Sequence, residues 1–351
     1  MIGRLLGGVA TSLLFSVFEA WLIRSHSDAD LPKSCLSKSF SWAAFGNSSV
    51  AIVAGLVANK FANFNSMEQV AGITYAGGFL NPFDLALFAL IACGVGAMML
   101  WEENYGEELE RDTAAKDEDS GKSLNGKWYD GLRNAFTTTV QNRDILFCGI
   151  ISSLFEGSMY IFVFMWTPLL RSFSKDSNED DDELPFGVIF STFMVCCMTG
   201  SSVFSFVVEK VPVEKLGVVI FAVGSLAMLL VAWGTTDTIA FLGMNLFEVC
   251  VGMYWPIMGT MKGGIVPEDK RAAIYNLYRI PLNFIVLFSL EANLTPTISF
   301  ALTASMLAVA TGLQLVLTKR RLENQGIQDS EDYSVVEATP LVEEAELSTA
   351  V

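Results

Sequence analysis

The chain has 351 residues, of which 52% are hydrophobic and 17% are charged, with a formal net charge of −16. Soluble globular proteins carry about 25% charged residues, and here the acids gather in three segments, 102–119, 176–183 and 329–346. The composition therefore excludes an ordinary soluble domain, and the acidic balance argues against a nucleic-acid partner, because phosphate backbones attract cations.

The weakly charged runs between these segments approach or exceed the roughly 20 residues that cross a bilayer as a helix. They predict nine membrane-spanning helices, at residues 3–23, 40–59, 80–101, 145–168, 186–208, 216–234, 239–261, 273–291 and 296–317. The predicted fold class is therefore all-α, a polytopic membrane protein with the lipid bilayer as its surroundings.

A polar segment between the third and fourth helices divides the chain. We expect an N-terminal group of three helices in 1–101, a linker in 102–144, a six-helix bundle in 145–317 and an acidic tail in 318–351.

The basic residues predict an orientation. When the loops are assigned alternately to the two sides, most of the 22 lysines and arginines fall on one side. The other side receives only Arg4, Lys60, Arg171 and Lys175. Since cytoplasmic loops are enriched in Lys and Arg, the linker and C-terminus are predicted to be cytoplasmic and the N-terminus to lie outside. A chain that has an odd number of spanning helices and an N-terminus on the outer side is unusual for a carrier built from repeats. We therefore expect further helices before Met1.

Few residues are suited to catalysis or metal binding. The six cysteines lack a CxxC spacing, and His26 is the only histidine. Metal clusters and hydrolytic triads usually need such residues, so we expect no metal, no cofactor and no enzyme activity.

Three apolar runs each carry one glutamate directly after a phenylalanine, at Glu19, Glu156 and Glu248. An ionised carboxylate in hydrocarbon costs about 3 kcal/mol on insertion scales, so such residues usually face a hydrated path or a partner. Tyr160 lies four residues after Glu156 and shares its helix face. The four residues are predicted to line a cavity or to couple protons. The alternative is a protonated glutamate that hydrogen-bonds a neighbouring helix.

One arginine, Arg279, lies in another apolar run, with Asn276 and Asn283 three residues before and four residues after it. The three form a polar stripe on an otherwise apolar helix, and the planar guanidinium suits an oxyanion. They are the predicted substrate-binding residues. A structural ion pair or a position near the membrane surface is the alternative reading of Arg279.

Several stretches resemble the molybdate-anion transporter branch of the major facilitator superfamily. They are Gly3-Arg4-Leu5-Leu6-Gly7-Gly8, Leu14-Phe15-Ser16-Val17-Phe18-Glu19-Ala20-Trp21, Trp101-Glu102-Glu103-Asn104-Tyr105, Leu154-Phe155-Glu156, Ile161-Phe162-Val163-Phe164-Met165-Trp166-Thr167-Pro168 and Tyr278-Arg279-Ile280-Pro281-Leu282.

The resemblance implies two six-helix bundles that move molybdate by alternating access, with the Phe-Glu helices lining the central cavity. The first predicted helix then matches the fourth of the family, so the first three family helices are absent from this sequence. We expect a secondary transporter of the cell membrane that takes up molybdate or a similar small anion. The missing helices, or a full-length homologue, would be its partner. The alternatives are a carrier of a sugar or other organic solute, and a non-transporting regulatory membrane fragment.

Overall fold

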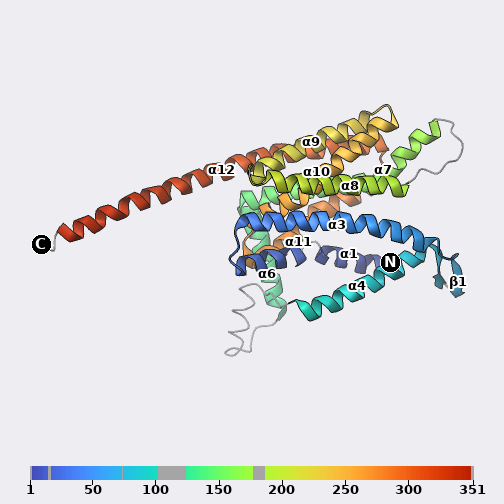
Figure 1. The fold of residues 1–351 in the computed structure, drawn as a ribbon, viewed down its shortest axis with the longest axis horizontal. Helices are drawn as coiled ribbons and strands as arrows, with labels where there is room; N and C mark the ends of the chain where they lie inside the picture. The colour runs from blue at the N-terminus through green and yellow to red at the C-terminus, as the bar shows by residue number, and fades with distance from the viewer. Residues whose placement is uncertain (1, 15–16, 73, 102–123, 177–185, 349–351) are drawn as a thin grey trace.

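The computed structural model describes residues 2–14, 17–72, 74–101, 124–176 and 186–348. Within these ranges the chain is almost entirely helical, and most of the long helices run side by side (Figure 1). Eight helices in this part of the chain are long and apolar enough to cross a membrane. The predicted class, a polytopic all-α membrane protein, is confirmed.

The N-terminal part differs from the prediction in two places. The predicted helix 3–23 corresponds to α1 (Ile2–Leu14) and α2 (Val17–Asp28), on either side of residues 15–16, which lie outside the described ranges. The next two predicted helices are α3 (Lys33–Ala62) and α4 (Asn81–Leu100). An antiparallel hairpin that was not predicted connects them, made of β1 (Glu68–Ala71) and β2 (Thr74–Ala76) and followed by the 3-10 turn η1 (Gly78–Leu80).

The C-terminal part contains the six predicted helices and one more. The six are α7 (Arg143–Asp176), α8 (Phe186–Val207), α9 (Val213–Trp233), α10 (Asp237–Ile265), α11 (Arg271–Glu291) and α12 (Pro296–Ser348), with the 3-10 turn η2 (Glu268–Lys270) before α11. The additional helix, α6 (Leu124–Gln141), lies inside the predicted linker 102–144, of which 102–123 is outside the described residues. Helix α12 continues into the predicted tail 318–351 and projects beyond the other helices (Figure 1).

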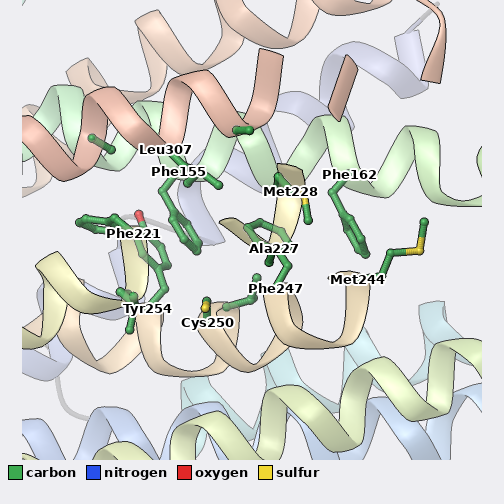
Figure 2. Close-up of a cluster of buried hydrophobic side chains, with 14 of the residues drawn as sticks. Phe155, Phe162, Phe221, Ala227, Met228, Met244, Phe247, Cys250, Tyr254 and Leu307 are labelled. Atoms are coloured by element: carbon green, nitrogen blue, oxygen red, sulfur yellow. The ribbon is translucent and has the colours of Figure 1, made fainter. Parts of the chain in front are cut away.

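A cluster of aromatic side chains forms the centre of the C-terminal helices (Figure 2). The ring of Phe155 on α7 stacks on that of Tyr254 on α10, with 4.0 Å between the centroids. Phe247 on α10 lies 5.7 Å from Phe155, and Phe221 on α9 lies 5.5 Å from it. Offset or stacked aromatic pairs stabilise packing beyond their buried area. These contacts fix α7, α9 and α10 relative to one another.

The N-terminal helices join the C-terminal ones through a second, smaller cluster. Ile23 on α2 and Leu36 on α3 are buried in it together with Ile274 on α11. Helix α4 has no buried side chain, and its Phe83 and Phe88 are exposed. An exposed apolar surface is typical of contact with a membrane or with further protein segments, and α4 is apolar and long enough to cross a membrane.

Helices α8 and α10 approach each other at two glycines. A Cβ atom on Gly252 would overlap the carbonyl oxygen of Cys197, and one on Gly200 would overlap that of Val249. Small residues at such crossings let the helix backbones touch, which is a common way of packing membrane helices.

We therefore expect Gly252→Ala to push α8 and α10 apart and to destabilise the protein by about 1–3 kcal/mol or more, as overpacking does. Gly187→Ala on α8 is the matched control, because a Cβ there meets nothing within 4 Å. Thermal unfolding of the two variants in detergent would test this, and equal unfolding temperatures would contradict it.

Candidate functional site

A small cavity of about 20 Å³ lies among α2, α7, α10 and α11, lined by Glu19, Ser152, Glu156, Trp255, Lys262, Tyr275, Tyr278 and Arg279. A volume of this size holds about one water molecule. In this conformation the cavity is therefore closed to larger molecules. Its lining contains two carboxyl groups and two cationic side chains.

An ion pair between Glu19 on α2 and Lys262 on α10 crosses this cavity. The Lys262 Nζ lies 3.1 Å from the Glu19 Oε2, and the two side chains are 8% and 16% exposed. The Nζ also lies 5.0 Å from the centre of the Tyr275 ring on α11, a cation–π distance. Glu19 Oε1 and the Tyr275 hydroxyl are buried without a hydrogen-bond partner among the described residues. Two cavity residues thus retain unused hydrogen-bonding capacity.

The second carboxyl group, on Glu156 of α7, is held by two hydroxyls. Ser152 Oγ donates to Glu156 Oε1 over 2.9 Å, and the Tyr254 hydroxyl donates to the same oxygen over 2.9 Å. Ser152 lies one helical turn before Glu156, whereas Tyr254 reaches it from α10. The stacking of Tyr254 on Phe155 therefore also orients a hydrogen bond to the cavity.

Of the predicted polar stripe on α11, the structure brings one residue to the cavity. Arg279 is half-buried and lines it, whereas Asn276 and Asn283 are exposed. Asn276 donates to the carbonyl oxygen of Ala272 in its own helix. Tyr275 and Arg279 are four residues apart and share a face, while Asn276 is turned about 100° from Tyr275. Arg279 thus lies at the border between the cavity and the exposed face.

Glu248 and Tyr160 are not among the residues that line the cavity. Glu248 is 5% exposed and lies near Cys196 and Cys197 of α8. Tyr160 is half-buried, and its ring is 6.4 Å from that of Phe164. The structure therefore brings together Glu19, Glu156 and Arg279 of the predicted group and places the others elsewhere.

The sequence analysis does not identify Lys262 as a cavity residue. Lys262 lies one residue beyond the predicted helix 239–261, so the charge pattern assigns it to a loop on the side that is rich in basic residues. Helix α10 continues to Ile265, so that Lys262 is inside it. The available signal was the apolar context, Met261-Lys262-Gly263-Gly264-Ile265, which differs from the charged loops that carry the other lysines.

Among the residues that the structure describes, no group of three or more His, Cys, Asp or Glu side chains could hold a metal ion.

Secondary transporters place their substrate sites between membrane helices, and this cavity lies in such a position, among α2, α7, α10 and α11. Residues 1–244 match a family of the major facilitator superfamily described as sugar transporters with 12 TM. The chain therefore belongs to the major facilitator superfamily.

Curated relatives support the resemblance drawn from the sequence. The chain is similar to the molybdate-anion transporter of Xenopus laevis, with 33% identity over 295 residues that cover 81% of this chain and 57% of the relative. The molybdate-anion transporter of Danio rerio is 30% identical over 308 residues, 83% of this chain and 60% of the relative. The chain thus spans less than two thirds of the length of these relatives.

Two solved structures share the fold. The proton:xylose symporter XylE matches with a TM-score of 0.53 and 13% identity, over 83% of this chain and 65% of its own. The E. coli fucose:proton symporter FucP matches with a TM-score of 0.55 and 13% identity, over 89% of this chain and 83% of its own. At this identity the likeness concerns the fold alone.

The Glu156 network gives a testable expectation. Tyr254→Phe removes a buried hydrogen bond to a carboxyl group and should destabilise the protein by about 1–3 kcal/mol, since bonds to charged or buried groups fall in this range. Tyr160→Phe is the control, because Tyr160 is on the same helix as Glu156 but is not among the residues that line the cavity. Chemical or thermal unfolding in detergent would measure both, and a larger loss for Tyr160→Phe would contradict the assignment.

Proposed function

We propose that the chain acts as a carrier of the major facilitator type that moves molybdate, or a similar small oxyanion, by alternating access. The observation that supports this most directly is the pair of cations, Lys262 and Arg279, that line one closed cavity. Arginine and lysine bind tetrahedral oxyanions through charge-assisted hydrogen bonds. The relatives named molybdate-anion transporter agree with this choice of substrate.

Charge balance indicates how such an anion would bind. Glu19 and Glu156 formally offset Lys262 and Arg279, so the lining is neutral when all four groups are ionised. A doubly charged anion among buried groups requires compensating positive charge. The anion would then replace Glu19 as the partner of Lys262, or a carboxyl group would take up a proton before the anion binds.

The other predicted residues have a place in this proposal. Asn276 and Asn283 lie three residues before and four residues after Arg279 on α11, and we propose them as further anion ligands when the cavity opens. Glu248 and Tyr160 would face the hydrated path in another conformation of the cycle.

We also propose the orientation and the division of the chain. Several basic residues form ion pairs at one end of the helices. Arg320 on α12 pairs with Asp144 at the start of α7, and Lys38 near the start of α3 pairs with Glu209. We propose that this side, with the linker 102–144 and the C-terminus, faces the cytoplasm and that the protein lies in the cell membrane; the positive-inside bias supports the orientation. Residues 1–101 and 145–317 would belong to the two halves that rock around the cavity.

A sugar or other organic solute is the second candidate substrate. It is favoured by the description of the matching family as sugar transporters, and under it the charged cavity residues would be structural pairs. The third candidate, a regulatory membrane fragment that does not transport, predicts co-purification with a full-length homologue and no uptake.

Uptake of labelled molybdate into proteoliposomes that contain the chain tests the proposal. We expect tungstate, which has the same shape and charge, to compete, and sugars not to compete. Competition by a sugar alone would favour the second candidate. Absence of any uptake, together with co-purification of a full-length homologue, would favour the third.

Arg279→Ala should lower molybdate uptake about tenfold or more, since a hydrogen bond to a charged group contributes about 1.5–3 kcal/mol. Arg279→Lys, which keeps the charge but loses the planar fork, should fall between this variant and the original protein. Arg171→Ala is the control, because Arg171 lines a different, exposed depression near Pro168. Unchanged uptake in Arg279→Ala would remove this residue from the anion site.

Glu156→Gln should flatten the dependence of uptake on pH, because an amide side chain, unlike a carboxyl group, does not take up or release a proton over the pH series that is measured. Gln keeps an acceptor oxygen for Ser152 and Tyr254, so the packing of the site is retained. Uptake of the variant and the original protein would be compared across a pH series. A pH profile identical to that of the original protein would exclude Glu156 as the coupling acid.

A further inference from the structure

Helix α6 is oriented differently from the helices that cross the membrane. It runs across their direction, near the start of α7 (Figure 1). One of its faces packs on α7 and α11, with Ala135 fully buried and Thr139 8% exposed. Helix α6 therefore lies at the end of the helical bundle, at the level where a membrane surface would be.

A second face of α6 is apolar but exposed. Leu132, Phe136 and Val140 are 38%, 59% and 52% exposed. They are spaced four residues apart, so they form one continuous stripe along the helix. An amphipathic helix that lies flat at the end of a membrane bundle usually buries such a stripe in the boundary between headgroups and acyl chains.

A depression beside this stripe is lined by basic and polar side chains. It has a volume of about 530 Å³ and is lined by Thr138, Gln141, Asn142, Arg143 and Arg320. Lys270 of the η2 turn reaches it, with its Nζ 3.3 Å from the Thr138 Oγ1. These side chains come from α6, α7, α12 and η2, and they place three cations next to one another.

Two acids face the same depression or its cations. Asp144 accepts from Arg320 Nε over 2.8 Å, and Asp269 lies 3.9 Å from the Nζ of Lys270. Arg143 is exposed, and among the described residues no ion pair engages it. The three cations and two acids leave an excess of positive charge, which Arg143 presents to the surroundings.

We propose that α6 lies in the headgroup layer of the membrane with its apolar stripe among the acyl chains, and that Arg143 and Arg320 bind the phosphate of an anionic phospholipid. We infer a phospholipid, and not a free anion, because the apolar stripe of α6 and the basic depression lie next to each other. The stripe requires an apolar partner, the adjacent depression requires an anion, and an anionic phospholipid supplies both groups in one molecule. Each basic residue near an anionic membrane surface contributes about 1 kcal/mol to binding.

The test is the retention of phosphatidylglycerol against phosphatidylcholine by the full chain, purified in detergent and measured by native mass spectrometry. We expect several-fold more phosphatidylglycerol than phosphatidylcholine on the original protein. Arg143→Gln should reduce this excess about fivefold, which is the order of 1 kcal/mol at one cation. Arg171→Gln, an exposed arginine far from this depression, should leave the excess unchanged.

Two further measurements separate the occupants. Phe136→Ser should lower retention of both lipids, because it interrupts the stripe while the cations remain. Inorganic phosphate should not displace the phosphatidylglycerol at millimolar concentration. Equal retention of the two lipids, an unchanged excess in Arg143→Gln, or displacement by phosphate alone would each overturn the proposal. Thermal unfolding of Arg143→Gln would show whether the variant is folded, and Arg143→Lys should restore the excess if charge is what binds.

Discussion

The buried ion pair between Glu19 and Lys262 is the interaction on which the closed cavity depends. Removing an ion from water costs several kcal/mol even after relaxation, and removal of one partner from a buried pair typically destabilises by about 3–5 kcal/mol. Each group is therefore tolerated only while the other is in place. Because Glu19 is on α2 and Lys262 is on α10, the cost of separating the charges adds to the packing of α3 on α8 and α10 that joins the N-terminal and C-terminal helices.

The same constraint links opening of the cavity to its contents. The cavity has room for about one water molecule, so a larger anion needs the helices to separate. Separation exposes Lys262 to water or to a new partner, and an anion that takes the place of Glu19 compensates the charge that would otherwise be lost. A ligand shifts a conformational equilibrium by its difference in affinity for the two states. Under the proposed function, an oxyanion would have this difference, because an open state would give it access to both Lys262 and Arg279.

The sequence predicted the spanning helices well because a bilayer requires long apolar runs in which the backbone bonds to itself. It also identified Glu19, Glu156 and Arg279, whose charges lie in such runs. It missed Lys262 at the end of a run, and it missed α6, because an amphipathic helix of the membrane surface contains no long apolar segment. The direction of Glu248 toward α8 was not predictable, since it depends on which faces of α8 and α10 meet at Gly200 and Gly252. Asn276 and Asn283 lie at other angles around the axis of α11 than Arg279, and a sequence pattern gives these angles only coarsely.

The contact between α8 and α10 has a mechanical consequence. Where two backbones touch at Gly200 and Gly252, neither helix can slide past the other without forcing carbonyl oxygens into the opposing chain. The two helices therefore move together as one rigid unit. Motion that reaches Lys262 near one end of α10 must carry α8 with it, and with α8 the surface that α3 packs against.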